Sequence, residues 1–308
     1  MIVPKPFPSA SKARKPKVAC LGHDIYFENH YCEKSTEKYD VGWFSFDHFS
    51  GGYYKELTRF RPDVTLVFRP ELHDGVNVKS IPGLKIGFST EPMPKISNGA
   101  IQRSSETDRR MRMLEHLNFQ AFDAVYHYDQ NSSSFAQSLG LRFSGFHRIP
   151  INTDLFHPFN KPPANWDVVF VGKATPRRIE ILQILKSYNL TFLWIEHGIS
   201  GKSLAEVFRR SKCILNIHAD DITALEPRVY LAAACGVPVL SDPYGNETFP
   251  MDDYVRVMNM TDLSVSAIRS TISEIGAATK NQSPKQLSHK LRMMSTEHFV
   301  GRLINKFT

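Results

Sequence analysis

The chain has 308 residues, which is long for a single hydrophobic core and sufficient for two domains of about 150 residues each. Hydrophobic residues make up 42% and charged residues 22%, which excludes an extensively disordered chain. The net charge of +7 suits nucleic acid, an anionic membrane surface or phosphate-bearing ligands. Because basic residues are spread along the chain without clustered aromatic residues, specific nucleic-acid binding is disfavoured.

The first residues are rich in proline and lysine and contain no apolar signal-peptide core. Apolar runs are all shorter than the roughly 18 to 20 residues of a membrane-spanning helix, so we expect a cytoplasmic protein. Residues 1–16 are expected to form a disordered basic leader. Weak peripheral contact with the anionic inner face of a membrane is the functional alternative. The cysteines lack C-x-x-C spacing, which indicates buried reduced thiols: Cys20, Cys32, Cys213 and Cys235.

Short apolar runs and helical patterns alternate along the whole chain. Strands are expected at residues 17–23, 61–71, 83–92, 122–129, 167–173, 190–198, 212–220 and 236–242. Helices are expected at residues 104–119, 177–188, 203–210, 227–235 and 262–279, with a last helical segment over residues 284–307. This alternation predicts an α/β fold with two doubly wound parallel sheets.

A stretch rich in Pro and Asn, residues 152–165, shows no periodicity and is the expected linker between the two domains. We place the domains at residues 17–157 and 158–284, and expect a C-terminal helix at 285–308 that packs back on the first domain. Open α/β sheets bind ligands beyond the carboxyl ends of their strands. The expected site is therefore a cleft between two facing sheets.

Several enzyme classes lack their motif in this chain. The first strand-to-helix turns read LGHDIY and VGKATPRR, without the G-x-G-x-x-G of dinucleotide-binding enzymes. The chain has no G-x-x-x-x-G-K-[ST] phosphate loop and no G-x-S-x-G nucleophile elbow. Asp-x-Asp is also absent, which disfavours a metal-held nucleotide sugar.

The segment VGKATPRR carries the first candidate ligand contacts. Thr175 is a good N-cap and Pro176 a good first helical residue, which puts Arg177 and Arg178 in the first helical turn and Lys173 in the loop before it. Basic residues in a first turn oppose the helix dipole, and a bound diphosphate would explain them. The alternative is that both arginines are solvated. In the first case, removing Lys173 or Arg178 should weaken diphosphate binding and leave the fold intact.

The segment LEPRVYLAAACGVPVLSD carries the second set of candidate ligand contacts. Pro227 starts a short helix that Gly236 ends, so Glu226 is the expected N-cap. Glu226 either caps the helix or accepts hydrogen bonds from sugar or ribose hydroxyl groups. Arg228 in the first turn again indicates an anion.

Taken in order, these segments resemble the GT-B class of glycosyltransferases, in particular the retaining group-1 superfamily and its CgeB-like (spore maturation protein) branch. The resemblance rests on HRIPINTDLFHP, VFVGKATPRR, EPRVYLAAACGVPVLSD, GLKIGFSTEPMP and HFVGRLINKF, and it covers nearly all of the chain after residue 16. It implies two Rossmann-like domains, the first binding the acceptor and the second a nucleotide-diphosphate sugar. Implied partners are this donor and a glycan, lipid-linked or small-molecule acceptor, as in polysaccharide biosynthesis.

The resemblance also implies roles for single residues. The donor's own phosphate accepts the acceptor proton, the sugar leaves with retention, and neither metal nor other cofactor is needed. The implied donor-binding residues are Gly172, Lys173, Arg178, His218, Glu226 and Arg228. The candidate acceptor contacts or bases, at strand ends of the first domain, are His23, Glu91 and His127.

One position departs from the family pattern. Leu231 stands where the family has the glutamate that holds the donor ribose. Either Glu226 takes over the hydroxyl contacts, or the donor site is altered or inactive. The alternatives to a glycosyltransferase are thus a catalytically inactive binding or scaffold subunit of the same fold, and a sugar-nucleotide epimerase.

Overall fold

The computed structural model describes residues 14–31, 36–46, 52–94, 96–97, 100–101, 105–219 and 224–305. The chain forms two compact units. The N-terminal unit runs to Asn152 and includes the residues from Ser295 onward, and the C-terminal unit spans Thr153–Met294. Residues 1–13 of the expected leader and Cys32 lie outside the described residues.

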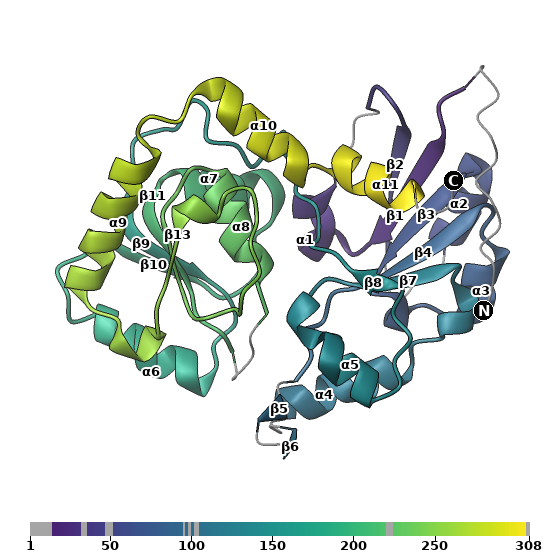
Figure 1. Ribbon diagram of the computed structural model, residues 1–308, viewed down its shortest axis with the longest axis horizontal. Helices are drawn as coiled ribbons and strands as arrows, with labels where there is room; N and C mark the ends of the chain where they lie inside the picture. Colours follow the sequence, from purple (N-terminus) through teal and green to yellow (C-terminus); the bar gives the residue numbers. More distant parts are fainter. Residues whose placement is uncertain are drawn as a thin grey trace. The chain divides into compact units, whose positions relative to one another are not determined.

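The N-terminal unit is built on a six-stranded sheet in the order β2-β1-β3-β4-β7-β8, with every neighbouring pair parallel (Figure 1). The strands are β1 (Lys17–Gly22), β2 (Asp40–Ser45), β3 (Val64–Phe68), β4 (Leu84–Ser89), β7 (Ala124–His127) and β8 (Gly145–Phe146). A separate antiparallel pair is formed by β5 (Ile96–Ser97) and β6 (Ala100–Ile101). The helices are α1 (Asp24–Phe27), α2 (Tyr53–Phe60), α3 (Gly75–Ser80), α4 (Ser105–Glu115), α5 (Ser133–Ser138) and α11 (Thr296–Ile304).

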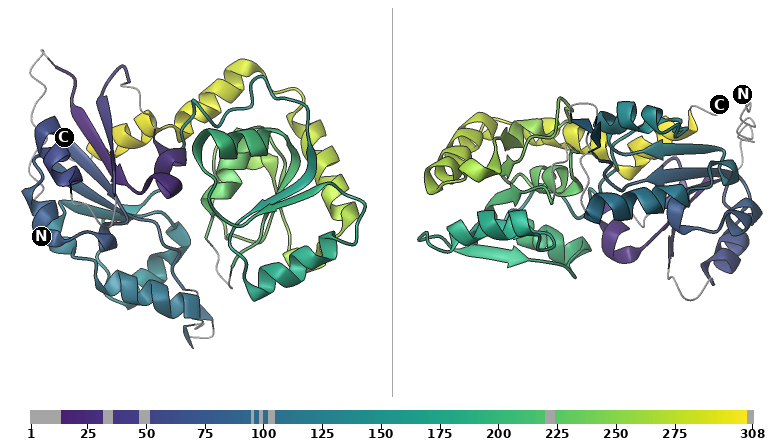
Figure 2. Two further views of the ribbon diagram at one scale, coloured as in Figure 1. Left: turned by 180° about the vertical axis from the view of Figure 1, so that it is seen from behind. Right: turned by 90° about the horizontal axis from the view of Figure 1, so that it is seen from below.

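The C-terminal unit has a five-stranded parallel sheet in the order β10-β9-β11-β12-β13. Its strands are β9 (Trp166–Val171), β10 (Phe192–Ile195), β11 (Ser211–Asn216), β12 (Val239–Ser241) and β13 (Val255–Val257). Its helices are α6 (Pro176–Leu185), α7 (Gly201–Arg209), α8 (Pro227–Ala234), α9 (Val265–Thr279) and α10 (Pro284–Met294), which the views of Figure 2 show on both faces of the sheet. The predicted fold class, two doubly wound parallel sheets, is confirmed.

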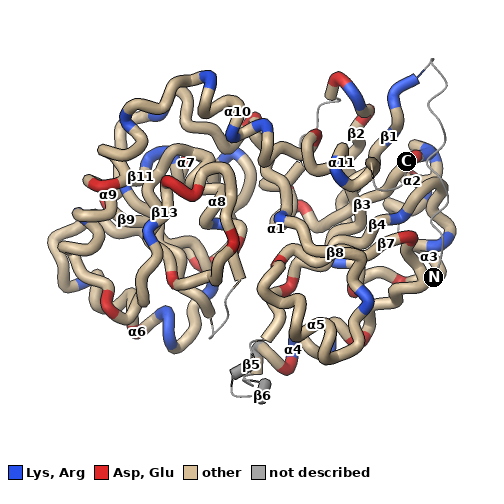
Figure 3. The backbone as a smooth tube through the Cα atoms, in the orientation of Figure 1, with Lys and Arg blue, Asp and Glu red and all other residues tan. Residues whose placement is uncertain are grey.

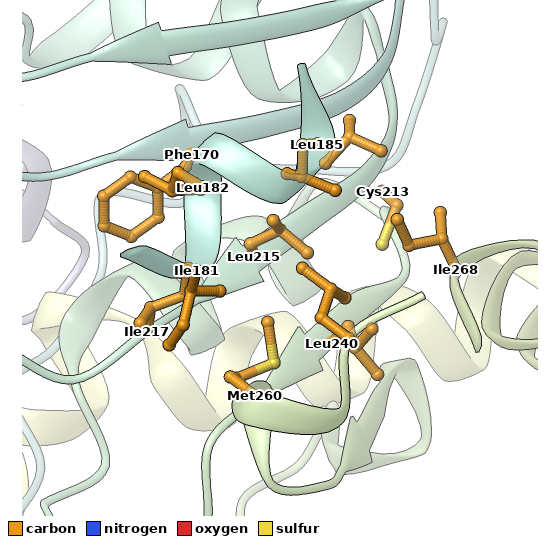
Figure 4. Packing of buried hydrophobic residues seen from close by; sticks show 12 residues of the cluster. Phe170, Ile181, Leu182, Leu185, Cys213, Leu215, Ile217, Leu240, Met260 and Ile268 are labelled. Atoms are coloured by element: carbon orange, nitrogen blue, oxygen red, sulfur yellow. The ribbon is translucent and has the colours of Figure 1, made fainter. Parts of the chain in front are cut away.

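The core of the C-terminal unit explains why its strands read as apolar runs. Side chains from β9 and β11 pack against the inner face of α6, with Met260 and Ile268 closing the cluster (Figure 4). Parallel strands covered by helices on both faces are apolar on both sides, unlike the alternating strands of a half-exposed sheet. This packing holds the carboxyl ends of β9 and β11 and the start of α6 in fixed positions.

The structure adds elements outside the predicted ranges and divides one predicted helix. Strand β2 and helix α2 lie outside the predicted ranges, and β2 is a partly buried strand at the edge of its sheet. The last helical segment is two helices, since Ser295 has extended backbone and its side chain accepts a hydrogen bond from the amide of His298. The predicted helix end at Gly236 is confirmed: its φ is +67°, and its amide donates to the carbonyl of Ala233 at 2.8 Å.

The predicted buried thiols are confirmed for Cys20, Cys213 and Cys235, all of which are free. Burial raises the pKa of each thiol to about 12, so none is a reactive thiolate near neutral pH. Within the described residues, no helix combines the length and apolar character needed to cross a membrane.

Each sheet has one point where the strand order reverses. In the C-terminal unit β10 lies on one side of β9 and β11 on the other, and in the N-terminal unit β2 and β3 flank β1 in the same way. The loops after the flanked strands diverge at such a point and leave room for a ligand. Gly172 follows β9 and His23 follows β1, so the two motifs selected from the sequence lie at the two reversal points.

Candidate functional site

The candidate site of the C-terminal unit lies where β9 and β11 end and where α6 and α8 begin. Thr175 is the N-cap of α6, with its side chain accepting a hydrogen bond from the amide of Arg178, and Pro176 is the first helical residue, as predicted. Pro227 likewise opens α8. Two helix N-termini and two strand ends are thereby brought to one edge of the sheet.

Arg178 is buried at this edge, with 4% of its surface exposed. Its Nε donates to the carbonyl oxygen of Ile217 at 2.8 Å, and its Nη1 donates to that of Lys173 at 3.1 Å. Its Nη2 lies 3.7 Å from Oε1 of Glu226. The guanidinium therefore joins the loop after β9 to the segment after β11, so it supports the fold as well as offering positive charge.

Arg228 reaches the same place from the first turn of α8. Its Nη2 lies 2.8 Å from Oε2 of Glu226, and its guanidinium carbon is 5.2 Å from the ring centre of Phe170. The guanidinium carbon of Arg178 is 5.3 Å from the same ring. A buried aromatic ring next to two cations stabilises them through its electron-rich face.

The two arginines converge on Gly172. A Cβ atom at this glycine would lie 3.3 Å from Nη1 of Arg228 and 3.4 Å from Nη1 of Arg178. It would also lie 3.0 Å from the ring of Phe170. A side chain at this position would therefore crowd both guanidinium groups, which gives a physical reason for glycine after β9.

Glu226 is the N-cap of α8, as predicted, but its side chain makes no capping hydrogen bond. The carboxylate instead lies between Arg178 and Arg228. Capping is thus not its role. Its negative charge offsets part of the repulsion between two arginines held close together.

Arg177, the other basic residue of the first turn, is paired with Asp242. Its Nη1 and Nη2 donate to the two carboxylate oxygens at 2.7 and 2.8 Å. Burial alone would raise the pKa of Asp242, but the hydrogen bonds from Arg177 and from the amide of His218 outweigh it and lower the pKa. Arg177 therefore fits neither the diphosphate interpretation nor its alternative of simple solvation, because its guanidinium is held by Asp242.

Lys173 and His218 complete the candidate donor contacts. Lys173 is exposed in the loop between β9 and α6. His218 follows β11 and is 2% exposed, and burial lowers the pKa of its imidazole. The structure therefore brings together all six residues selected for this site: Gly172, Lys173, Arg178, His218, Glu226 and Arg228. Figure 3 shows basic and acidic residues interspersed along the backbone of the C-terminal unit.

Leu231 lies in α8, one turn after the start of the helix, with 2% of its surface exposed. Its neighbours Tyr230 and Ala232 are fully buried as well. The side chain is a packing residue, and it offers no polar contact to a ligand.

In the N-terminal unit, Glu91 is held by arginines. Its carboxylate lies 2.6 Å from Arg69, 3.4 Å from Arg109 and 3.8 Å from Arg110. Arg69 also pairs with Glu71, whose pKa is raised because burial outweighs the pairing. Arg69 adopts a left-handed backbone conformation with a φ of +61°, which the sequence did not predict.

His127 ends β7 and is fully buried. Its Nδ1 lies 3.1 Å from the amide of Asp129, and its Nε2 lies 2.9 Å from the carbonyl oxygen of Glu91. An accepting Nδ1 and a donating Nε2 describe the neutral imidazole, and burial lowers the pKa accordingly. This geometry suits a residue that positions the segment of Glu91.

His23 lies at the end of β1, separated in the sheet from β7 by β3 and β4. Its carbonyl oxygen accepts hydrogen bonds from the amides of Tyr26 and Phe27 in α1, and its ring is 5.4 Å from the ring of Tyr26. Glu91 and His127 are therefore adjacent, and His23 is at a different point of the same sheet edge.

No cluster of three or more His, Cys, Asp or Glu side chains that could hold a metal ion occurs among the described residues.

Comparisons with known proteins agree with this arrangement. A family model described as glycosyl transferase-like matches residues 177–292. Among solved structures, the fold is similar to a sucrose-phosphate synthase from Thermosynechococcus elongatus, with a TM-score of 0.52, 12% identity and coverage of 95% of this chain and 99% of that one. It is also similar to a UDP-forming α,α-trehalose-phosphate synthase from Burkholderia xenovorans, with a TM-score of 0.51, 8% identity and coverage of 96% and 99%. A search of curated proteins gives no match.

The residues matched by the family model, 177–292, run from α6 to α10. They include four of the six site residues: Arg178, His218, Glu226 and Arg228. At such low identities the solved structures establish the fold alone. The chain therefore has the GT-B fold of glycosyltransferases, and its C-terminal unit is glycosyl transferase-like in sequence.

Proposed function

We propose that the protein is a glycosyltransferase that takes a sugar from a nucleotide-diphosphate donor bound by the C-terminal unit. The observation that carries this proposal is the convergence of Arg178 and Arg228 on Gly172 at the reversal point of the sheet. Two guanidinium groups held this close repel each other, and Glu226 supplies one counter-charge. A diphosphate would supply the rest and would meet the amide groups of two helix N-termini.

The chemistry needs few protein groups. As the bond between sugar and diphosphate breaks, negative charge grows on the leaving diphosphate, and fixed cations stabilise it. Lys173 and Arg228 are the donor-site cations with exposed surface, whereas Arg178 is tied to two carbonyl oxygens. We assign Lys173 and Arg228 to the diphosphate and Arg178 to the support of the loop. Retention, independence from metal and the CgeB-like branch are parts of the same proposal.

The acceptor is assigned to the N-terminal unit, in the class of glycan, lipid-linked or small-molecule acceptors. Glu91 is the best-placed candidate, because Arg69 and Arg109 hold its carboxylate in a fixed position. His23 is a second candidate contact, and His127 is proposed to position Glu91. Weak contact of the basic leader with an anionic membrane surface is a further part of the proposal.

A catalytically inactive binding subunit is the second candidate, and the buried Leu231 favours it. The family glutamate that holds the ribose is replaced here by a packing residue. Donor turnover separates the two candidates. The parent chain should release nucleoside diphosphate from a sugar nucleotide when an acceptor extract is present, and the rate should survive EDTA because no metal takes part.

Lys173→Ala should reduce donor affinity by about tenfold or more, since it removes a charge-assisted contact. Its fold should be unaffected, because the side chain is exposed. Lys186→Ala, an exposed lysine at the other end of α6, is the matched control and should behave like the parent. Turnover that EDTA abolishes and Mg²⁺ restores would contradict the assigned chemistry. A parent that binds the sugar nucleotide without ever releasing diphosphate would support the binding subunit.

A further inference from the structure

His218 is fixed in place by its own backbone. Its amide donates to Oδ2 of Asp242 at 2.8 Å, and its carbonyl oxygen accepts from Nη1 of Arg177 at 3.0 Å. Arg177 and Asp242 are themselves joined by two hydrogen bonds. Asp242 also accepts from the amide of Met260 at 3.2 Å. One ion pair thus holds the peptide groups on both sides of His218.

The imidazole of His218 does not share in this bonding. Its Nε2 is buried and has no hydrogen-bond partner within the part of the chain that the structure describes. A buried polar atom without a partner costs free energy, and in native proteins it usually meets a water, an ion or a ligand. The backbone of His218 is therefore fixed by hydrogen bonds, while Nε2 of its ring is available to bind a ligand.

The charges around the ring indicate the class of ligand. Four charged side chains act on the imidazole: Arg177 of α6, Glu226 and Arg228 of the start of α8, and Asp242 after β12. Arg177 and Asp242 neutralise each other, and Glu226 is shared between Arg228 and Arg178. Among these residues and the nearby Arg178, cations outnumber carboxylates, so the free nitrogen lies in a region that favours an anion.

We propose that His218 binds the diphosphate of a nucleotide ligand through Nε2–H, and that Arg177 and Asp242 are positioning residues that hold His218 for this contact. The assignment rests on the proposed function, because it names the ligand of the same site. The assignment extends the proposed function, because it gives the Arg177–Asp242 pair a role in ligand binding in addition to its role in the fold. No bond is made or broken in this step; a hydrogen bond forms to a phosphate oxygen.

The titration of His218 tests the proposal directly. Its ring resonances can be followed by NMR and assigned by their absence in His218→Gln. Saturation with a nucleoside diphosphate should raise the pKa of His218, because a nearby anion favours the imidazolium form. Binding should correspondingly tighten as the pH falls through this pKa. A pKa of His218 that is unchanged at saturation would overturn the proposal.

Variants of the pair give a second readout, which combines the pKa of His218 with the affinity for a nucleoside diphosphate. In the free protein, Asp242→Asn removes an anion and should lower the pKa of His218, whereas Arg177→Met removes a cation and should raise it. Both should weaken diphosphate binding by about tenfold. Shifts of the pKa in the same direction, or binding like that of the parent in both variants, would contradict the positioning role. Asp242→Asn keeps the shape of the side chain, so this arm does not depend on the stability of Arg177→Met.

His218→Gln should retain much of the affinity, because its amide N–H replaces Nε2–H, and it should lose the pH dependence relative to the parent. His218→Phe should bind the nucleoside diphosphate more weakly than the parent at every pH. Equal affinity of both variants and the parent would overturn this inference alone. If the parent itself binds no nucleoside diphosphate, the proposed function fails, and this inference fails with it.

Discussion

Leu231→Glu should lower the free energy of unfolding by at least about 3 kcal/mol. The side chain is 2% exposed within an apolar helix of the C-terminal unit. The change replaces an apolar side chain at a buried position with a carboxylate, which loses its hydration there. Urea unfolding of the parent and the variant measures the loss.

The pH dependence of this loss has a definite sign. Burial raises the pKa of a carboxyl group in the folded state above its value in the unfolded chain. The variant is then most stable at low pH, where the carboxyl is protonated in both the folded and the unfolded chain. Its free energy of unfolding falls as the pH rises above the pKa of the unfolded chain. The deficit relative to the parent should therefore be larger at about pH 8 than at about pH 5.

Leu231→Met is the matched control, because it keeps an apolar side chain of similar volume and should cost less than about 1.5 kcal/mol. A Leu231→Glu variant as stable as the parent would contradict the packing role of Leu231. If that variant also bound nucleotides more tightly, the side chain would reach the ligand, as the family pattern implies.

Arg178→Met should lower the free energy of unfolding by about 2 to 4 kcal/mol and weaken nucleoside-diphosphate binding at least tenfold. The change leaves the carbonyl oxygens of Ile217 and Lys173 without their donor and leaves Glu226 with one counter-charge fewer. Both the fold and the ligand contacts should therefore suffer. Urea unfolding and calorimetric titration measure the two effects separately.

Arg210→Met provides the control for a surface ion pair. Arg210 pairs with Glu206 one turn away on α7, with side chains 34% and 46% exposed. Its removal should cost less than about 1 kcal/mol and leave nucleotide binding unchanged. Equal stability losses for Arg178→Met and Arg210→Met would contradict the supporting role of Arg178.

Much of the fold follows from the sequence, because parallel strands buried on both faces give unmistakable apolar runs. Strands β1, β3, β4, β7 and β9 to β12 all lie within the predicted ranges to within a residue or two. Edge strands carry a weaker signal: β13 is a three-residue strand at the edge of its sheet. Caps at Thr175 and Gly236 could be predicted because their chemistry is local.

The partners of the charged side chains could not be predicted from the sequence. The sequence placed Arg177 and Arg178 correctly in the first turn of α6, but it left open whether they contact a ligand or solvent. Their partners, Asp242 and the carbonyl of Ile217, come from other strands, and sequence spacing does not reveal such contacts. For the same reason, the arginines around Glu91 were not linked to it.

The central claim is that the C-terminal unit binds a nucleotide diphosphate at the edge formed by Gly172, Arg228 and His218. Calorimetric titration of the parent chain with nucleoside diphosphates of all the common bases, in EDTA, tests it most directly. We expect one of them to bind with one ligand per chain. At about 100 times its dissociation constant it should add about 2.7 kcal/mol to the free energy of unfolding. No binding of any of these nucleotides, with or without Mg²⁺, would contradict the claim.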